Sequence, residues 1–240
     1  MEVRLQKPQR EDLALRFTLA PFITEWVSTQ ANFITAIAQK FGDWLSVRPQ
    51  DFSSNPSGNL GEAWCMYRIF GGASTIVLRP DTLELNFVNL NENDRQSVIE
   101  IIRRSGSVLQ QDIGSYTRCY VSLTSNRHAE IAGDGNADRY LNQFALKQAV
   151  DMVKADSDME YKPTARVILS HKGGDWSVRR LVEKSDFLPD GLFVYTLVSI
   201  PSFDLAELNE QGELIDHIFE RADKAVELSY VGESDADANS

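Results

Sequence analysis

The chain has few of the residues from which metal and disulfide sites are built. Its 240 residues include two cysteines, Cys65 and Cys119, and three histidines. Each cysteine lies within an apolar run, so both are expected to be small buried side chains, and a disulfide between them is disfavoured. No Cys/His pairing has the spacing of metal ligands, and we therefore predict no metal site.

Long apolar runs and known catalytic signatures are also missing. No window approaches the roughly 18 consecutive apolar residues of a transmembrane helix, and residues 1–12 are followed by no signal-type run. We therefore expect a cytoplasmic protein. The patterns of phosphate-binding loops, dinucleotide-binding folds, hydrolase elbows and zinc proteases are absent as well. The sequence thus offers no catalytic residue and implies no cofactor, and it favours a non-enzymatic role without excluding an enzyme.

The charge is strongly acidic. Thirty-five acidic residues stand against 24 basic ones, which gives a formal net charge of −11. Binding to nucleic acid depends on Lys and Arg side chains that neutralise phosphates, so nucleic acid is a poor partner, whereas a basic protein is favoured. Residues 232–240 are expected to be a disordered acidic tail. We interpret two arginine pairs as solvated surface charges: Arg103-Arg104 and Arg179-Arg180.

Apolar periodicity divides the chain into strands and helices. A period of two predicts strands near residues 12–19, 63–70, 74–78, 83–88, 116–123, 165–171, 176–183 and 192–200. A period near 3.6 predicts helices near residues 24–45, 91–109, 138–154 and 203–230. Two polar segments are expected to be irregular: residues 46–62 and 125–138. The four tryptophans fall inside predicted elements and are expected in the core: Trp26, Trp44, Trp64 and Trp176.

The order of these elements is repeated along the chain. A strand, a helix, a three-stranded meander and a second helix follow one another from residue 12 to 110 and again from 116 to 228. We therefore predict an α+β fold of two similar β-α-βββ-α halves, residues 1–113 and 114–231, with antiparallel meanders and helices that cover the sheets. The two meanders could share one sheet or form two packed sheets.

One polar segment begins like a calcium-binding loop. Asp134, Asn136 and Asp138 have the one-three-five spacing of such loops. Arg139 and Ala145, however, stand where an EF-hand has Gly and Glu. A polar turn that caps the following helix is therefore favoured over a calcium site.

The three histidines also have simple structural interpretations. His128 is followed by Glu130, but no nucleophile is positioned beside them, so a catalytic role is disfavoured. His171 precedes a Gly-Gly hairpin turn, whose glycines meet a steric need of the turn. His217 follows Asp216 in the last predicted helix, at the edge of its buried stripe.

Three segments carry a resemblance to a known family: residues 64–88 (WCMYRIFGGASTIVLRPDTLELNFV), residues 179–201 (RRLVEKSDFLPDGLFVYTLVSIP) and residues 216–219 (DHIF). They are similar to parts of a sporadically distributed family of uncharacterised bacterial proteins of similar length. The resemblance implies a bacterial protein with the same order of elements. It implies no activity and no site residue.

Two functional classes are compatible with these patterns. The favoured one is a cytosolic protein-binding module that offers a sheet face, or the groove between the halves, to a basic protein in a toxin, antitoxin, defence or chaperone-like context. The alternative is an enzyme or small-molecule binder with a pocket between the halves, rimmed by residues 46–62 and 125–138. Either class is compatible with a homodimer.

Overall fold

The computed structural model of the chain describes residues 3–6, 8, 10–132, 137–142, 166–173, 176–206 and 228–230. Some sequence predictions lie outside this described part. They include the predicted tail at 232–240, most of the helix predicted for 138–154 and most of the final predicted helix, with His217. Asp134 and Asn136 of the calcium-like segment also lie outside it.

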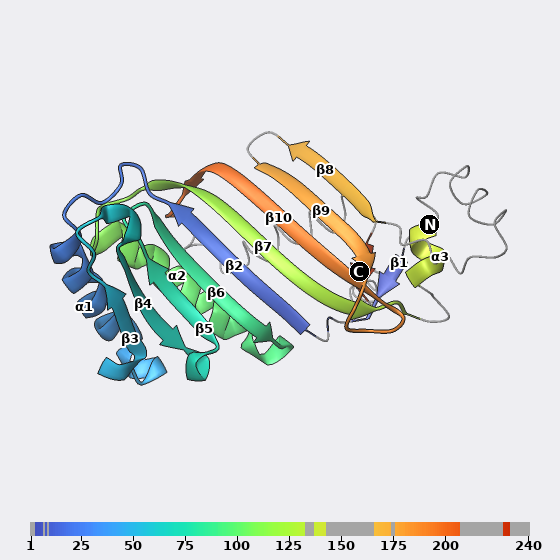
Figure 1. Ribbon diagram of the computed structural model, residues 1–240, viewed down its shortest axis with the longest axis horizontal. Helices are drawn as coiled ribbons and strands as arrows, with labels where there is room; N and C mark the ends of the chain where they lie inside the picture. The colour runs from blue at the N-terminus through green and yellow to red at the C-terminus, as the bar shows by residue number, and fades with distance from the viewer. Residues whose placement is uncertain are drawn as a thin grey trace, which may run out of the picture.

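Nine of the described strands form one continuous antiparallel sheet (Figure 1). Their order across the sheet is β3-β4-β5-β6-β2-β7-β10-β9-β8. The strands are β2 (Arg10–Thr18), β3 (Phe52–Asn55), β4 (Trp64–Ile69), β5 (Ser74–Leu78), β6 (Thr82–Leu90), β7 (Arg118–Glu130), β8 (Val167–Gly173), β9 (Trp176–Lys184) and β10 (Gly191–Asp204). A separate parallel pair joins β1 (Val3–Leu5) to β11 (Leu228–Tyr230). The two predicted meanders therefore share a single sheet.

The described helices all lie on one side of this sheet. They are α1 (Trp26–Leu45), α2 (Arg95–Gln111) and the short α3 (Ala137–Asn142). Figure 1 shows α1 and α2 behind the strands from β3 to β6. We call this side of the sheet the covered face and the opposite side the open face. Single 3-10 turns complete the described elements: η1 (Pro49–Asp51), η2 (Leu60–Glu62), η3 (Phe70–Gly72) and η4 (Glu92–Asp94).

The main core lies between the covered face and the two long helices. Alternate residues of β2, among them Leu15 and Phe17, belong to the same buried cluster as Phe33 and Ile37 of α1. A strand alternates its side chains and a helix repeats near 3.6 residues, so each element needs only one apolar face to build this core. Each fully buried large apolar side chain contributes about 2 kcal/mol to folding.

A second, smaller core lies farther along β7, β9 and β10. Val182 and Val194 meet Tyr140 and Leu141 of α3 in this cluster, and Leu5 of β1 joins them. The covered face thus carries two separate apolar clusters rather than one.

Side chains of Asn91 and Asp94 hold the turn η4, which precedes α2. The Asn91 side chain accepts a hydrogen bond from the backbone N–H of Asn93 (2.9 Å), and the Asp94 carboxylate accepts one from the N–H of Asn91 (3.0 Å). These bonds satisfy backbone donors at the turn η4, after which α2 begins at Arg95.

Strand β7 is longer than predicted, and the irregular segment expected from residue 125 onward is wrong for residues 125–130. These residues continue the strand, with Ser125, Arg127 and Ala129 buried on the covered face. The alternation was hidden in the sequence because two of the three inward residues are polar.

The predicted end of the last long strand is also wrong. Strand β10 continues past Pro201 to Asp204, although a helix was expected from Phe203. The register with β7 shifts between Ile200 and Phe203, and such an irregularity accommodates a proline that cannot donate a ladder hydrogen bond. Residues 228–230, at the end of the same predicted helix, form β11 instead.

The first polar segment, 46–62, contains a strand that was not expected. Strand β3 pairs with β4 at one edge of the sheet, and the Phe52 ring stacks on Tyr67 at 5.0 Å. The rest of its sequence is Ser and Asn, so no apolar alternation marked it. An edge strand has one bonded neighbour, and short polar strands are common there.

Core placement is correct for the cysteines but not for every tryptophan. Cys65 and Cys119 are buried free thiols, and burial raises the pKa of each to about 11. Trp26 is buried, whereas Trp44 is 37% exposed near the end of α1. The Arg104 guanidinium lies 5.3 Å from the Trp44 ring centre, which shields the ring without burying it. Within the described part, no helix is both long and apolar enough to cross a membrane.

Candidate functional site

Side chains on the open face form rows that cross the sheet. Directly opposed residues of paired strands project on the same face, so the register defines each row. One row, which we call the apolar row, consists of Ile168, Leu181 and Tyr195, on β8, β9 and β10. It continues through Asn126 on β7 to Asp12 on β2. Ile168 is 53% exposed, because the described helices lie on the other face.

A row of polar side chains crosses the covered face at nearly the same level. We call it the polar belt, and it consists of Glu11, Ser125, Arg127, Arg180 and Thr196. The Glu11 carboxylate accepts hydrogen bonds from Arg127 Nε (2.8 Å) and from Ser125 Oγ (3.0 Å). Arg180 Nε donates to Thr196 Oγ1 (3.0 Å). The belt lies between the main core and the smaller core, which explains why the covered face has two apolar clusters.

The belt and the apolar row together invert the usual inside-outside pattern. On β9, Arg180 is fully buried while its neighbour Leu181 projects onto the open face. On β10, Thr196 is buried while Tyr195 projects outward. Burial of a charged group costs free energy that its partners must offset, and Leu181 and Tyr195, which are only part-buried on the open face, forgo part of the gain of burial. An outward apolar row over inward polar groups marks this part of the open face as the candidate site.

A shallow hollow of about 270 Å³ adjoins the apolar row on the open face of β8, β9 and β10. Its lining consists of Ser170, Lys172, Ser177, Val178, Arg179, Leu197 and Ser199. Ser177 and Ser199 are direct cross-strand neighbours, and their small side chains leave the space that Lys172 and Arg179 flank. In the described part of the chain, neither cation has a hydrogen-bond or ion-pair partner.

The two arginine pairs that were expected to be solvated surface charges each include an arginine with structural contacts instead. Arg179 is exposed, as predicted, but Arg180 is buried in the polar belt. Arg103 and Arg104 both bind the Glu100 carboxylate, and these contacts lower the Glu100 pKa to about 2 against the opposing effect of burial. Arg104 also donates to the backbone carbonyl of Lys40 on α1, so this pair joins the two helices.

His128 contacts a structural turn through Ser185. Ser185 Oγ accepts hydrogen bonds from the backbone N–H groups of Phe187 (3.1 Å) and Leu188 (2.9 Å). The same hydroxyl forms a hydrogen bond with His128 Nδ1 at 2.9 Å, so Ser185 connects the imidazole to the turn. Burial, and secondly the positive charge of Arg10, lower the pKa of His128.

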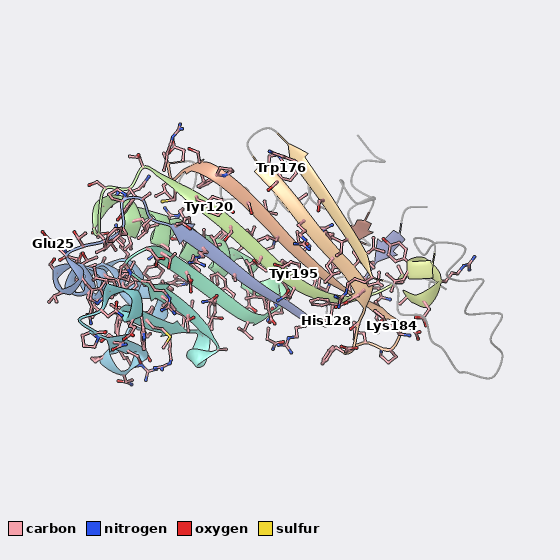
Figure 2. All side chains as sticks on the ribbon, turned by 45° about the horizontal axis from the view of Figure 1, so that its top comes forward. Glu25, Tyr120, His128, Trp176, Lys184 and Tyr195 are labelled. Carbon is pink, nitrogen blue, oxygen red and sulfur yellow. The ribbon has the colours of Figure 1, made fainter. Side chains whose placement is uncertain are left out.

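The surroundings of His128 lack the parts of a nucleophilic site. Its ring lies between those of Phe187 and Phe193, with centroid distances of 5.7 Å and 5.0 Å. Ser185 is buried and already caps the turn, so its oxygen is not free to attack a substrate. Figure 2 shows His128 at the far end of the strand that also carries Tyr120.

The remaining predicted positions do not assemble into a site. Asp138 opens α3 and pairs with Lys184 of β9 at 2.9 Å, while His171 falls within β8, opposite Val178. No cluster of three or more His, Cys, Asp or Glu residues suited to a metal ion occurs among the residues that the structure describes. The described strand residues of the two polar segments, 52–55 and 125–130, lie apart, at the edge and in the middle of the same sheet, so these residues do not rim a common pocket.

Sequence reasoning missed both the polar belt and the hollow. A one-residue change of register exchanges the two faces of a strand, so Arg179 and Arg180 could not be told apart without the pairing of β9. One signal was available: the run Arg179-Arg180-Leu181-Val182 alternates poorly for a strand with a simple apolar side.

Comparisons with known proteins give no family for this chain. No protein-family model matches it. No curated protein matches it either.

Proposed function

We propose that this protein is a non-enzymatic protein-binding module that receives a polypeptide partner on the open face of its sheet. The inverted pattern on β9 and β10 is the observation that carries the proposal. Leu181 and Tyr195 face outward where Arg180 and Thr196 are buried. A partner that covers the apolar row would recover the burial that the fold itself leaves unused.

Charge refines the proposed partner. Residues 207–240 contain ten acidic and two basic side chains, a net charge of −8, so the rest of the chain has only −3 of the total −11. On β8 and β9 the open face carries two neighbouring cations, Lys172 and Arg179. The net charge that favours a basic partner thus comes mainly from residues 207–240. The cations of the open face suit a neutral or acidic segment instead.

A repeated architecture fits the same proposal. Outward from β2 the sheet runs β6, β5 and β4, and outward from β7 it runs β10, β9 and β8. The equal order supports two similar halves, residues 1–113 and 114–231, that meet where β2 pairs with β7. Two related halves give one broad surface of nine strands, long enough for an extended partner to cross.

The alternative, an enzyme with a pocket between the halves, has less support. The described lining of the hollow lies wholly on β8, β9 and β10, and no histidine or carboxylate is among these described residues. A small-molecule site is commonly a deep cavity, and this hollow is shallow.

Position-specific photo-cross-linking in native cells tests the proposal. A photo-reactive phenylalanine analogue replaces Ile168 on the open face, and the same analogue replaces Val27, which is 80% exposed on α1, as the matched control. We expect discrete protein adducts at position 168 that are absent at position 27. Leu181→Asp in the same protein should remove the adducts while the circular dichroism spectrum stays unchanged.

Two results would overturn the proposal. One is an absence of protein adducts at position 168. The other is the same set of adducts at positions 27 and 168, which would indicate random collision rather than a defined binding face.

A further inference from the structure

We propose that the hollow on β8, β9 and β10 binds a carboxylate of the partner, and that the apolar row binds a large apolar side chain two residues away on the same extended segment. This inference rests on the proposed function and specifies the partner chemistry. The occupant is thus an acidic segment of a protein in which an Asp or Glu is separated by one residue from a Leu, Ile, Val or aromatic residue.

Charge complementarity identifies the occupant of the hollow. Lys172 and Arg179 flank it, and within the described residues their side chains have no acceptor. Other cations on this face are engaged: Arg16 lies 3.6 Å from Glu84, and Arg68 donates to Ser53. Two uncommitted cations in one hollow of an acidic protein attract an anion.

The serines of the hollow supply further donors. Ser170, Ser177 and Ser199 line it together with the two cations. A hydroxyl donates one hydrogen bond, and a carboxylate accepts several, so the group suits a carboxylate better than an ammonium. The guanidinium of Arg179 can form two parallel bonds to one carboxylate, which would fix its orientation.

The spacing between hollow and apolar row matches an extended peptide. Arg179 and Leu181 are two residues apart on β9, as are Leu197 and Tyr195 on β10, and both pairs project on the open face. Two residues of a strand advance about 6.8 Å. A peptide that runs along these strands has the same advance, so a carboxylate over Arg179 places the side chain two residues on over Leu181 and Tyr195.

Binding of short fluorescent peptides to the full chain tests this inference. The probes share the sequence Gly-Thr-X-Val-Z-Val-Thr-Gly, with Asp and Leu, Lys and Leu, or Asp and Ser at X and Z. Fluorescence anisotropy measures the affinity at low and at high salt. The protein variants are the double variant Lys172→Glu/Arg179→Glu and, as a control, Arg68→Glu, which makes the same kind of change on β4 about 29 Å away across the sheet.

We expect the Asp/Leu probe to bind best, and the double variant to weaken it about tenfold, while Arg68→Glu changes its affinity less than about twofold. The double variant should also prefer the Lys/Leu probe, because its reversed charges would attract an ammonium. High salt should reduce these differences.

Equal binding of the Asp and Lys probes, or an unchanged affinity of the double variant, would overturn the inference. Failure of all three probes to bind would overturn it too. None of these three results decides the proposed function, because cross-linked adducts at position 168 report on the open face whatever the charge of the partner.

Discussion

The nine-stranded sheet has two sides that flank the central pair β2 and β7, one with β6, β5 and β4 and the other with β10, β9 and β8. These two sides differ in the side chains that they bury. On the side of β6, β5 and β4, inward residues such as Leu85, Ile76 and Tyr67 are fully buried. Their outward neighbours include polar residues such as Asn86 and apolar ones such as Val77. On the side of β10, β9 and β8, the polar belt faces inward and the apolar row faces outward. The second side therefore buries charged side chains at the place where we propose the contact surface.

The largest expected difference in stability comes from truncating one leucine on each side of the sheet. Leu85→Ala on β6 removes a fully buried side chain and should lower the free energy of unfolding by about 3 kcal/mol. Leu181→Ala on β9 removes the same atoms from the open face and should cost less than about 1 kcal/mol. Urea denaturation measures both. Equal losses would contradict the assignment of Leu181 to a contact surface.

The second test concerns the polar belt. Glu11→Ala leaves Arg127 without its carboxylate and should cost about 3 kcal/mol. Its neighbour Asp12 projects on the open face, where it pairs with Arg10 at 3.3 Å and accepts a hydrogen bond from Asn89, so Asp12→Ala should cost about 1 kcal/mol.

A double variant sharpens this second test. Glu11→Leu/Arg127→Leu replaces the ion pair by apolar side chains and should regain most of the stability lost in Glu11→Ala. If the double variant is less stable than Glu11→Ala, the belt contributes net stability and the contrast between the two sides is smaller than proposed.

The smallest expected effect is a pH dependence at the end of β7. Burial and Arg10 lower the pKa of His128 below the 6.5 of an exposed histidine, so the unfolded chain binds a proton that the folded chain does not. The stability from this site is therefore complete above pH 6.5 and declines as the pH falls from there toward the lower pKa of the folded state. Denaturation midpoints between pH 5 and 7.5 measure this slope, and His128→Phe should flatten it. An unchanged slope in the variant would assign it to other groups.

The part of the fold that the sequence predicted well is the part with a consistent pattern. Strands β2, β4, β5 and β6 and helix α1 were predicted within a few residues, since their apolar side chains repeat without interruption. Residues 125–130 were taken for a loop because the inward positions Ser125 and Arg127 are polar. Ser125 and Arg127 belong to the polar belt, so the inward polar residues that obscured the strand in the sequence also mark the candidate site.

The site itself depends on long-range pairing that periodicity does not contain. Arg179 and Ser199 meet only because β9 pairs with β10 in one particular register. A single sequence shows that Arg179 and Arg180 lie on opposite faces of a strand, but not which face is open. The fold class was thus within reach of the sequence, and the location of the candidate site was not.

The central position of β2 has a consequence for synthesis of the chain. Residues 10–18 leave the ribosome early and can pair with β6 once residue 90 has emerged, but their other neighbour, β7, begins only at residue 118. Until β7 has been made, β2 has an unpaired edge, although it becomes a central strand of the finished sheet. Its residues Leu13, Leu15 and Phe17 belong to the main core. Nascent chains arrested between residues 90 and 118 would therefore expose an unpaired strand edge, a feature that promotes aggregation.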